Sequence, residues 1–554
     1  MQTTMSENSL ALLYQKLPAS GRVLNVAIVV QTLRISLFTA RLIADVAACE
    51  FARAAVLVVE DADAGSAGGP EWAGASYAAY RFFLRRFDRR DAPLPDAQAT
   101  MDGGSLVAPL RRDATCLDDA DVILDLRDRG GTDPWRHIPS GGVWQFRFGS
   151  TSRRLDSPPF LWEQIDQDLV TQVALECRTA QGETQTLCEI AFGTVFSFSL
   201  AANSHAPLWG ATHMVSRKLR DLSALPAIIP VAREGERIAT PAAKHAAQRT
   251  PTNLPLAAWM GREIGKRAVG RLFRGRRTSR WKVGLRRSVT PLLRASSPAD
   301  LARFTWLEAP AGHYWADPIL FSQGADTWLF IEDYVDADGK AILLCGRLCD
   351  DGRIEDLRPC LERPYHLSYP HVFEHGGDFF MVPESAASGQ VELYRAVRFP
   401  YEWKLERVLL PLCAVDSTML RHADRWWLFS TAMPVPGHGA PTLLFSAQHL
   451  DGPWVEHPGG PICSDVRNSR GAGPCFVDAG QLIRPSQDCS GNYGRRLNFN
   501  VIQALDAAQY REETLASIAP GWMPSMIGVH TYSRAGDWEA IDGLFDVPLK
   551  SQAQ

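Results

Sequence analysis

Residues 315–333 have the sequence WADPILFSQGADTWLFIED, in which a short apolar run, a polar turn and a second, more aromatic run follow one another. Two such runs around a turn that contains glycine predict a β-hairpin. The same pattern recurs in four later segments, which are residues 368–385, 414–431, 472–488 and 527–543. The segments begin roughly 50 residues apart, and five repeats at this spacing predict a five-bladed β-propeller with four strands in each blade.

The segments between the repeats supply the remaining strands of the predicted blades. Residues 341–345 and 391–395 are short apolar runs that we expect to be outer strands. Residues 281–286 lie before the first repeat, and we expect them to close the ring by pairing with the last blade. The predicted propeller domain therefore covers residues 280–550.

The composition is that of a soluble globular protein rather than a disordered or fibrous one. The chain has 554 residues, of which 46% are hydrophobic and 22% charged, and its net charge is -4. This length suits two large domains, and the nearly neutral charge argues against a general nucleic-acid binder. The 16 tryptophans require burial between blades or a flat ligand such as a sugar ring.

The part of the chain before the repeats predicts an α/β domain over residues 21–230. Residues 22–30 and 54–60 are apolar runs typical of buried parallel strands, and residues 33–52 between them have helical spacing. Residues 120–126 and 142–148 predict two more strands. This order predicts a doubly wound sheet. The sequence after the first strand lacks a glycine-rich phosphate loop, so we expect no dinucleotide and no other cofactor.

Residues 231–279 predict a linker that becomes strongly basic from Arg262 onward. Apolar residues at helical spacing, from Leu256 to Leu272, predict an amphipathic helix in this range. Such a helix either packs between two domains or makes peripheral contact with an anionic membrane, and the sequence leaves both open.

Targeting signals and cysteine usage bear on the cellular location. The first 23 residues do not have the pattern of a secretion signal, and the uncharged stretch 190–216 is too polar to span a membrane. The 11 cysteines are scattered without a CxxC pair, which predicts reduced thiols and no structural metal site. We expect a cytoplasmic protein, with membrane association through the basic linker as an alternative.

Acidic residues recur at equivalent positions of the repeats. Asp317, Tyr369 and Asp416 align just before the first strand of their repeats, and Glu332 and Glu384 align near the end of the second. In a propeller both positions lie at one mouth of the central channel. Crowded carboxylates raise one another's pKa, and glycoside chemistry requires one protonated and one ionised carboxyl group. Asp317, Glu384 and Asp416 are therefore candidate catalytic residues.

Further polar and aromatic residues near these positions are candidates for binding substrate. Arginines hold carboxylates or phosphates by paired hydrogen bonds, although they also neutralise neighbouring acids. Aromatic rings stack on sugars, and a histidine near the axis either contacts substrate or is structural. The candidates are Trp315, Glu332, Tyr369, His371, Arg470, Arg484, Gln487, Asp488, Tyr493 and His530. Their spacing has no metal-ligand signature.

Two sets of motifs in the propeller resemble known families. WADPIL around Asp317 and VDSTML around Asp416 resemble the five-bladed propellers of the furanosidase superfamily, such as family 43 glycoside hydrolases. HLSYPHVF, VPES and RPSQDCSGNYG are similar to the N-terminal propeller domain of plant glucosamine inositolphosphorylceramide transferases and their bacterial relatives. The first resemblance implies that Asp317 is the general base and Asp416 an orienting group. Arg470 stands where that family has its acid, so Glu384 is the substitute candidate.

The order of elements in the N-terminal domain resembles a formyltransferase-like domain that precedes a propeller in bacterial carbohydrate-cluster proteins. Residues 148–151 stand where relatives carry a histidine-containing loop, and no matching Asn, His and Asp set is present. We therefore expect this domain to be degenerate, with a structural or substrate-docking role.

These observations predict a carbohydrate-active protein that hydrolyses or transfers a glycosyl unit at the propeller mouth. The substrate would be a carbohydrate or glycolipid, in polysaccharide or glycolipid biosynthesis. One alternative is a non-catalytic glycan-binding or scaffold protein. Another is a formyl- or acyltransferase that acts through the N-terminal domain.

Overall fold

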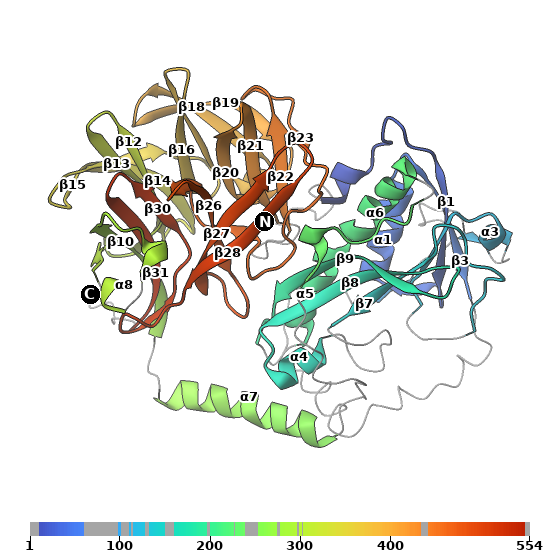
Figure 1. Ribbon diagram of the computed structural model, residues 1–554. Coiled ribbons are helices and arrows are strands. Elements are labelled where there is room, and N and C mark those ends of the chain that lie inside the picture. The colour runs from blue at the N-terminus through green and yellow to red at the C-terminus, as the bar shows by residue number, and fades with distance from the viewer. Residues whose placement is uncertain are drawn as a thin grey trace. The chain divides into compact units, whose positions relative to one another are not determined.

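The computed structural model describes residues 10–59, 98–100, 110–111, 115–127, 132–149, 160–196, 200–225, 228–238, 253–273, 277–295, 298–301, 303–433 and 441–548 (Figure 1). It divides into two compact units, residues 1–270 and 271–554. Each unit has its own sheets and its own buried core.

The first unit is built on a seven-stranded mixed sheet with the order β5-β3-β1-β6-β7-β8-β9. The first five strands in this order run parallel to their neighbours, whereas β8 and β9 are antiparallel additions. The strands are β1 (Leu24–Val30), β3 (Ala52–Val58), β5 (Leu110–Arg111), β6 (Val122–Asp125), β7 (Val143–Phe148), β8 (Val170–Arg178) and β9 (Thr184–Gly193). The predicted α/β architecture is thus present, and the predicted doubly wound sheet is seen in part.

The parallel strands are apolar because the middle of the sheet is covered on both faces. Six of the seven residues of β1 are buried, and so are all four of β6. Between β1 and β3 lies helix α1 (Leu37–Ala47), at whose start the Ser36 hydroxyl accepts a hydrogen bond from the Thr39 amide. The predicted strand, helix and strand at 22–60 are therefore found within a few residues of their expected bounds.

The remaining elements of this unit are mostly short. They are η1 (Leu10–Tyr14), β2 (Arg34–Ser36), β4 (Gln98–Thr100), α3 (Thr115–Asp118), α4 (Leu161–Asp166), α5 (Leu200–Ala211), α6 (His213–Ala224), η2 (Glu234–Glu236) and α7 (Asn253–Phe273). A buried network joins α6 to the segment after it, because Lys218 and Arg217 both contact the Glu236 carboxylate.

Helix α7 occupies much of the range that the sequence predicts as a basic linker. Leu256 and Trp259 are buried, and the Arg262 guanidinium donates to the carbonyl oxygens of Gln164 and Ile165. The described part of the helix therefore packs against the first unit through α4. No helix among the described residues combines the length and the apolar character needed to cross a bilayer.

The second unit is a five-bladed β-propeller, as the repeats predict. Three blades are regular four-stranded antiparallel sheets in chain order. Blade 1 has β12 (His313–Gln323), β13 (Asp326–Val335), β14 (Lys340–Leu348) and β15 (Ile354–Leu361); blade 2 has β16 (Ser368–His375), β17 (Asp378–Glu384), β18 (Val391–Arg398) and β19 (Glu402–Leu410); blade 3 has β20 (Ala414–His422), β21 (Arg425–Ala432), β22 (Thr442–Ala447) and β23 (Val455–Glu456).

Blades 4 and 5 have a first strand that is broken in two. Blade 4 has β24 (Arg470–Gly471), β25 (Phe476–Asp478), β26 (Gln481–Asp488), β27 (Arg496–Leu505) and β28 (Tyr510–Ile518); blade 5 has β29 (Met526–Gly528), β30 (Tyr532–Ala535), β31 (Trp538–Pro548), β10 (Arg277–Arg287) and β11 (Thr305–Trp306). Short elements η3 (Leu292–Arg294), α8 (Pro298–Leu301) and η4 (Ala386–Ser388) connect strands.

Blade 5 closes the ring with strands from both ends of the propeller sequence. Strand β10 pairs with β31 over eleven residues, from Arg277 opposite Pro548 to Arg287 opposite Trp538. The predicted closing strand at 281–286 is therefore confirmed. Figure 1 shows β10 beside β31 and the other blades arranged around the ring.

The cores of the propeller lie between neighbouring sheets, where many of the aromatic residues are found. Phe330, Tyr394 and Trp403 belong to one buried cluster, and Trp427 and Phe429 belong to another. Burial of Trp403, Trp426, Trp427 and Trp538 accounts for part of the tryptophan content. The ten cysteines other than Cys116 are free thiols.

Candidate active site

Three blades carry the same backbone irregularity in their first strand. The register with the second strand shifts between Ala316 and Ile319, between Ser368 and His371, and between Val415 and Thr418. The residues at the start of these bulges are Asp317, Tyr369 and Asp416, and all three have positive φ, at 49°, 46° and 49°. A β-bulge turns a side chain away from the regular alternation, so each bulge presents its first residue differently from the rest of the strand.

The residue just before each bulge pairs with a fixed position on the second strand. Ala316 pairs with Glu332, Ser368 with Glu384 and Val415 with Thr431, and in blade 4 Arg470 pairs with Gln487. The registers therefore give the alignment expected from the repeats. Because first and second strands are antiparallel, these pairs lie at the same end of their blades as the bulges.

Asp317 is buried and receives several hydrogen bonds. The Thr531 hydroxyl donates to its Oδ1 at 2.6 Å, and the Tyr369 amide donates to its Oδ2 at 3.2 Å. His530 Nε2 lies 3.7 Å from the same Oδ1. Blades 1, 2 and 5 thus meet at this carboxyl group.

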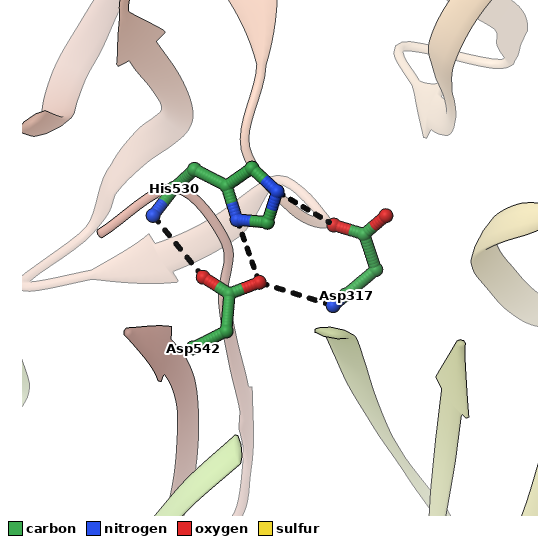
Figure 2. A group of neighbouring side chains, drawn as sticks. All are labelled: Asp317, His530 and Asp542. Atoms are coloured by element: carbon green, nitrogen blue, oxygen red, sulfur yellow. Dashed lines mark hydrogen bonds and ion pairs between the residues drawn. The ribbon is translucent and has the colours of Figure 1, made fainter. Parts of the chain in front are cut away.

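His530 and Asp542 form a pair beside Asp317 (Figure 2). His530 Nδ1 lies 2.6 Å from Asp542 Oδ2, and that oxygen also accepts from the Asp317 amide at 3.0 Å. The other oxygen of Asp542 accepts from the amides of His530 and Thr531. The carboxylate of Asp542 therefore fixes both the imidazole and the backbone of the Asp317 bulge.

Burial and charge shift the ionisation of this group. Burial raises the pKa of Asp317 to about 6, with the Asp416 and Asp542 charges adding to the rise and the His530 charge opposing it. Burial alone would lower the pKa of His530, but the charge of Asp542 and its hydrogen bond raise that pKa above its usual value. The raised pKa of His530 favours a protonated imidazole, whereas the raised pKa of Asp317 favours its neutral form below about pH 6.

Glu332 and Glu384 are carboxyl groups whose pKa is raised further. Burial raises the pKa of Glu384 to about 8, Asp416 adds to the rise through its charge and a hydrogen bond, and Arg470 opposes it. Burial, followed by the charges of Asp317 and Glu384, raises the pKa of Glu332 well above its usual range. Near neutral pH, Glu384 therefore carries a proton while Asp317 is mostly ionised.

Arg470 from blade 4 lies beside the carboxylates of blades 2 and 3. Its Nε contacts Asp416 Oδ2, and its Nη2 lies 3.6 Å from Glu384 Oε2. Its guanidinium carbon lies 4.6 Å from the centre of the Tyr493 ring, and the Gln487 amide also donates to Asp416, at 3.1 Å. Arg470 thus compensates part of the buried negative charge while Tyr493, which is exposed, covers its other face.

Tyr369 does not have a free hydroxyl group for substrate. The Tyr369 hydroxyl lies 2.7 Å from Thr418 Oγ1 and accepts from the Gly473 amide at 2.7 Å, and the side chain is fully buried. Its backbone amide serves Asp317, as described above. Tyr369 therefore connects blades 2, 3 and 4 rather than offering an exposed ring.

Four other predicted site residues have partners outside this carboxylate cluster. His371 Nε2 lies 3.1 Å from the Met419 carbonyl oxygen, and burial lowers its pKa to about 4. Trp315 donates its indole hydrogen to Asp333. Arg484 pairs with Glu512 at 2.6 Å, and Asp488 accepts from the Ser490 amide.

Sequence reasoning missed Asp542, Thr531, His366 and Trp281. Trp281 stacks on His530 with ring centres 3.9 Å apart, and His366 Nε2 lies 3.7 Å from Glu332 Oε1. Aligning the fifth repeat on the bulge would have shown that Asp542 falls on the second strand beside the axis. Trp281 and His366 lie outside the five repeats, so the repeat gave no signal for them.

Asp317, His530 and Asp542 are also the group of described residues best able to hold a metal ion. One donor atom from each lies within 4.8 Å of the others. Two carboxylates and an imidazole suit a divalent cation. His530 Nδ1 and Asp542 Oδ2 already lie at hydrogen-bond distance, so the same three side chains are equally consistent with a hydrogen-bonded chain.

Fold and site together define a five-bladed propeller whose channel mouth is lined by buried carboxyl groups. Residues 302–519 match the family model described as glucosamine inositolphosphorylceramide transferase 1, N-terminal. The resemblance expected from the propeller motifs is thereby confirmed. The formyltransferase-like resemblance of the first unit stays a prediction.

Two plant proteins show the extent of this similarity. Glucosamine inositolphosphorylceramide transferase 1 of Arabidopsis thaliana is 36% identical over 217 residues, which are 38% of this chain and 28% of that protein. The protein of the same name from Oryza sativa subsp. japonica is 35% identical over 202 residues, 36% of this chain and 27% of that protein. The chain therefore spans less than a third of the length of these relatives.

Solved structures similar to this chain include carbohydrate-active enzymes. The GH43_1 enzyme from Xanthomonas citri complexed with xylose has a TM-score of 0.33 at 16% identity, covering 47% of this chain and 94% of that one. An exo-β-1,3-galactanase from Clostridium thermocellum has a TM-score of 0.32 at 10% identity, covering 38% and 53%.

Proposed function

We propose that the propeller mouth carries out acid–base chemistry on a glycosidic bond, hydrolysing or transferring a glycosyl unit. The observation that supports this most is the gathering of buried carboxyl groups from three blades at one channel mouth, where burial raises the pKa of Glu384 to about 8 and that of Asp317 to about 6. A carboxylic acid and a carboxylate in one site are what departure of a sugar oxygen and activation of a nucleophile require.

In this proposal Glu384 protonates the departing oxygen, and Asp317 acts as base or nucleophile. Asp416 is the orienting group, because it contacts Arg470 and hydrogen-bonds to Glu384. Trp315, Glu332, Tyr493 and Arg470 would bind substrate around them. Rates should rise as pH passes 6, where Asp317 ionises, and fall above 8, where Glu384 loses its proton.

The substrate class and the setting belong to the same proposal. The similarity to glucosamine inositolphosphorylceramide transferases favours a glycolipid or polysaccharide substrate in a biosynthetic setting. The proposal also includes a cytoplasmic location and peripheral membrane contact through the basic segment after Arg262. It further assigns a docking role to the first unit, as a doubly wound, formyltransferase-like domain.

The first test compares Asp317→Asn and Glu384→Gln with the parent protein on furanosides, pyranosides, nucleotide sugars and glycolipids. On any substrate that turns over, we expect each variant to lose activity by about a hundredfold or more, because one proton transfer is removed. Asp378→Asn is the matched control, since Asp378 is half-exposed and pairs with Arg395. Equal activity of parent and both variants on every active substrate would refute the mechanism.

Arg470 favours a second candidate function, non-catalytic glycan binding. Arg470 contacts both Asp416 and Glu384, at the position where the resembled hydrolases have their acid. A binding protein would retain oligosaccharides without turnover at every pH between 6 and 8. Calorimetry with the same panel therefore separates the two candidates.

A further inference from the structure

A cavity of about 760 Å³ lies on the propeller away from the carboxylate mouth. Residues of blade 2 and blade 3 line it, including the β20–β21 turn and Trp426. That turn joins the ends of the strands farthest from Asp416, so the cavity opens at the opposite end of these two blades. Its size lies in the range of small-molecule sites.

Three arginines of this cavity lack the close carboxylate partner that most arginines of the propeller have. Arg407 donates to the Asp451 carbonyl oxygen at 2.9 Å, and Arg425 lies 3.3 Å from Ser446 Oγ. Arg421 has its nearest carboxylate oxygen, on Asp424, at 3.9 Å. Among the described residues, no carboxylate lies within 4.0 Å of Arg407 or Arg425.

Other propeller arginines show the contrast. Arg280 lies 2.6 Å from Asp336, Arg395 lies 2.6 Å from Asp378, and Arg484 lies 2.6 Å from Glu512. Three guanidinium groups around one cavity, each without such a partner, form a site suited to an oxyanion, which they would bind by paired hydrogen bonds.

The carboxylates of the same cavity limit the kind of anion. Glu406 and Asp451 also line it, and Glu406 lies 3.8 Å from Lys404. Asp424 is fully exposed, so its charge is screened by solvent. A polyanion would be repelled by these acids, whereas a ligand with one charged group and several hydroxyl groups would donate hydrogen bonds to them.

The turn in the cavity wall is strained. Ala423 and Asp424 have positive φ, at 50° and 59°, whereas the equivalent turn of blade 2 has Gly376 and Gly377. Alanine adopts this conformation less readily than glycine or aspartate does, and backbone strain of this kind is concentrated at binding sites.

We propose that this cavity is a binding site for a small sugar phosphate. Arg421, Arg425 and Arg407 hold the phosphate, and Glu406 and Asp451 accept hydrogen bonds from sugar hydroxyls. His375 and His449 supply further polar groups at the wall. The site is separate from the carboxylate mouth, and its occupancy does not depend on the function proposed for that mouth.

Calorimetric titration of the full-length protein with glucose 1-phosphate, inorganic phosphate and glucose tests this site. We expect glucose 1-phosphate to bind at one site, phosphate to bind more weakly, and glucose to show no binding. Arg421→Gln and Arg425→Gln should each weaken glucose 1-phosphate binding about tenfold or more, since a charge-assisted hydrogen bond is lost.

Arg347→Gln is the matched control, because Arg347 is a similarly exposed arginine of blade 1 that pairs with Glu355. The affinity of this variant for glucose 1-phosphate should lie within about twofold of the parent's. Melting temperatures of all three variants confirm that the fold is kept. No binding of glucose 1-phosphate, an equal loss in the control, or no loss in the cavity variants would overturn the site. Equal affinity for inorganic phosphate would overturn the assignment to a sugar phosphate.

Discussion

Glu384 shows how an acid group suited to catalysis weakens the fold that holds it. Its pKa is raised to about 8 in the folded protein by burial, from an ordinary value of 4.5. The stability associated with the protonated group is complete below pH 4.5 and is lost as the pH rises through 8. Between pH 4.5 and 8, the folded protein therefore keeps a proton on Glu384 that the unfolded chain would release. Folding becomes less favourable as the pH rises through this range.

Glu384→Gln should therefore raise the melting temperature of the propeller, and increasingly so as the pH rises. Glutamine keeps the shape and cannot ionise. We expect no difference from the parent at pH 4.5 and a gain of about 3 °C or more at pH 8. Thermal unfolding between pH 4.5 and pH 8 measures this difference in melting temperature. Glu374→Gln is the control, because Glu374 is exposed on β16 of the same blade. A difference that does not change with pH would contradict the explanation.

Arg470 has the opposite effect on the same cluster. Arg470→Met would leave the Asp416 carboxylate buried without its cation. We expect this to lower the free energy of unfolding by about 3–5 kcal/mol. The positive charge of Arg470 also lowers the pKa of Glu384, so any activity should persist to higher pH in this variant.

Arg280→Met is a suitable comparison for Arg470→Met, because Arg280 pairs with Asp336 at a more exposed site. Loss of the ion pair between Arg280 and Asp336 should lower the free energy of unfolding by about 1 kcal/mol or less. Chemical denaturation of both variants measures the difference. Similar losses in the two would show that Arg470 contributes no more than a surface ion pair.

At this scale the sequence predicts acids better than it predicts their partners. Asp317, Glu332, Glu384 and Asp416 align because the hairpin repeat fixes their register. His366 lies in the connection between β15 and β16, and Trp281 lies on β10; both are outside the repeat, so their places depend on how the blades pack. Arg484 and Glu512 face each other across the second and fourth strands of blade 4, a contact that depends on the twist of the sheet.

In the turn between β20 and β21, the residue at position 423 fits the backbone conformation poorly. Ala423 has a φ of 50°, while Gly376 at the same place in blade 2 has a φ of 64°. Ala423→Gly should stabilise the propeller by about 1 kcal/mol, because glycine adopts this conformation without a Cβ clash.

The reciprocal change, Gly376→Ala, should destabilise the propeller by a similar amount. No atom lies within 4 Å of the position that a Cβ would take at Gly376, so the cost would come from the backbone alone. Melting temperatures of the two variants at one pH give the comparison. If Ala423→Gly proves neutral or destabilising, the turn is not strained, and one support for the sugar-phosphate site is removed.

Elements were predictable where their periodicity is strong. The strands of the propeller and the first strand, helix and strand of the α/β unit appear within a few residues of expectation. Strands β8 and β9 were not expected, because they are antiparallel additions whose polar and apolar residues do not form a short apolar run. Their presence makes the sheet mixed.

On the scale of the whole molecule, the ring of blades constrains the site more than any single strand does. Asp317 in blade 1 is held by Thr531 and His530 of blade 5, and by the Tyr369 amide of blade 2. These contacts exist only while blade 5 is complete. Because β10 comes from the start of the propeller sequence, the geometry at Asp317 depends on pairing between residues more than 200 positions apart.

We therefore expect removal of β10 to unfold the propeller, and not merely to shorten blade 5 by one strand. A fragment of residues 271–554 should fold with one cooperative thermal transition, since it forms one compact unit. A fragment of residues 288–554 loses eleven paired residues and leaves the outer edge of β31 unpaired, which is an aggregation-prone edge. We expect it to lack that transition and to bind a hydrophobic dye.

A synthetic peptide of residues 271–295 added to the shorter fragment separates loss of closure from general damage. If closure through β10 is what the fragment lacks, the peptide should restore the cooperative transition, because it supplies the missing strand and its buried Val283 and Leu285. A peptide with Val283→Asp should fail, since that side chain would place an unpaired charge in the core beside β31. If the fragment 288–554 melts like 271–554 without any peptide, ring closure does not determine the stability of the propeller, and the four remaining blades must hold the carboxylate mouth by themselves.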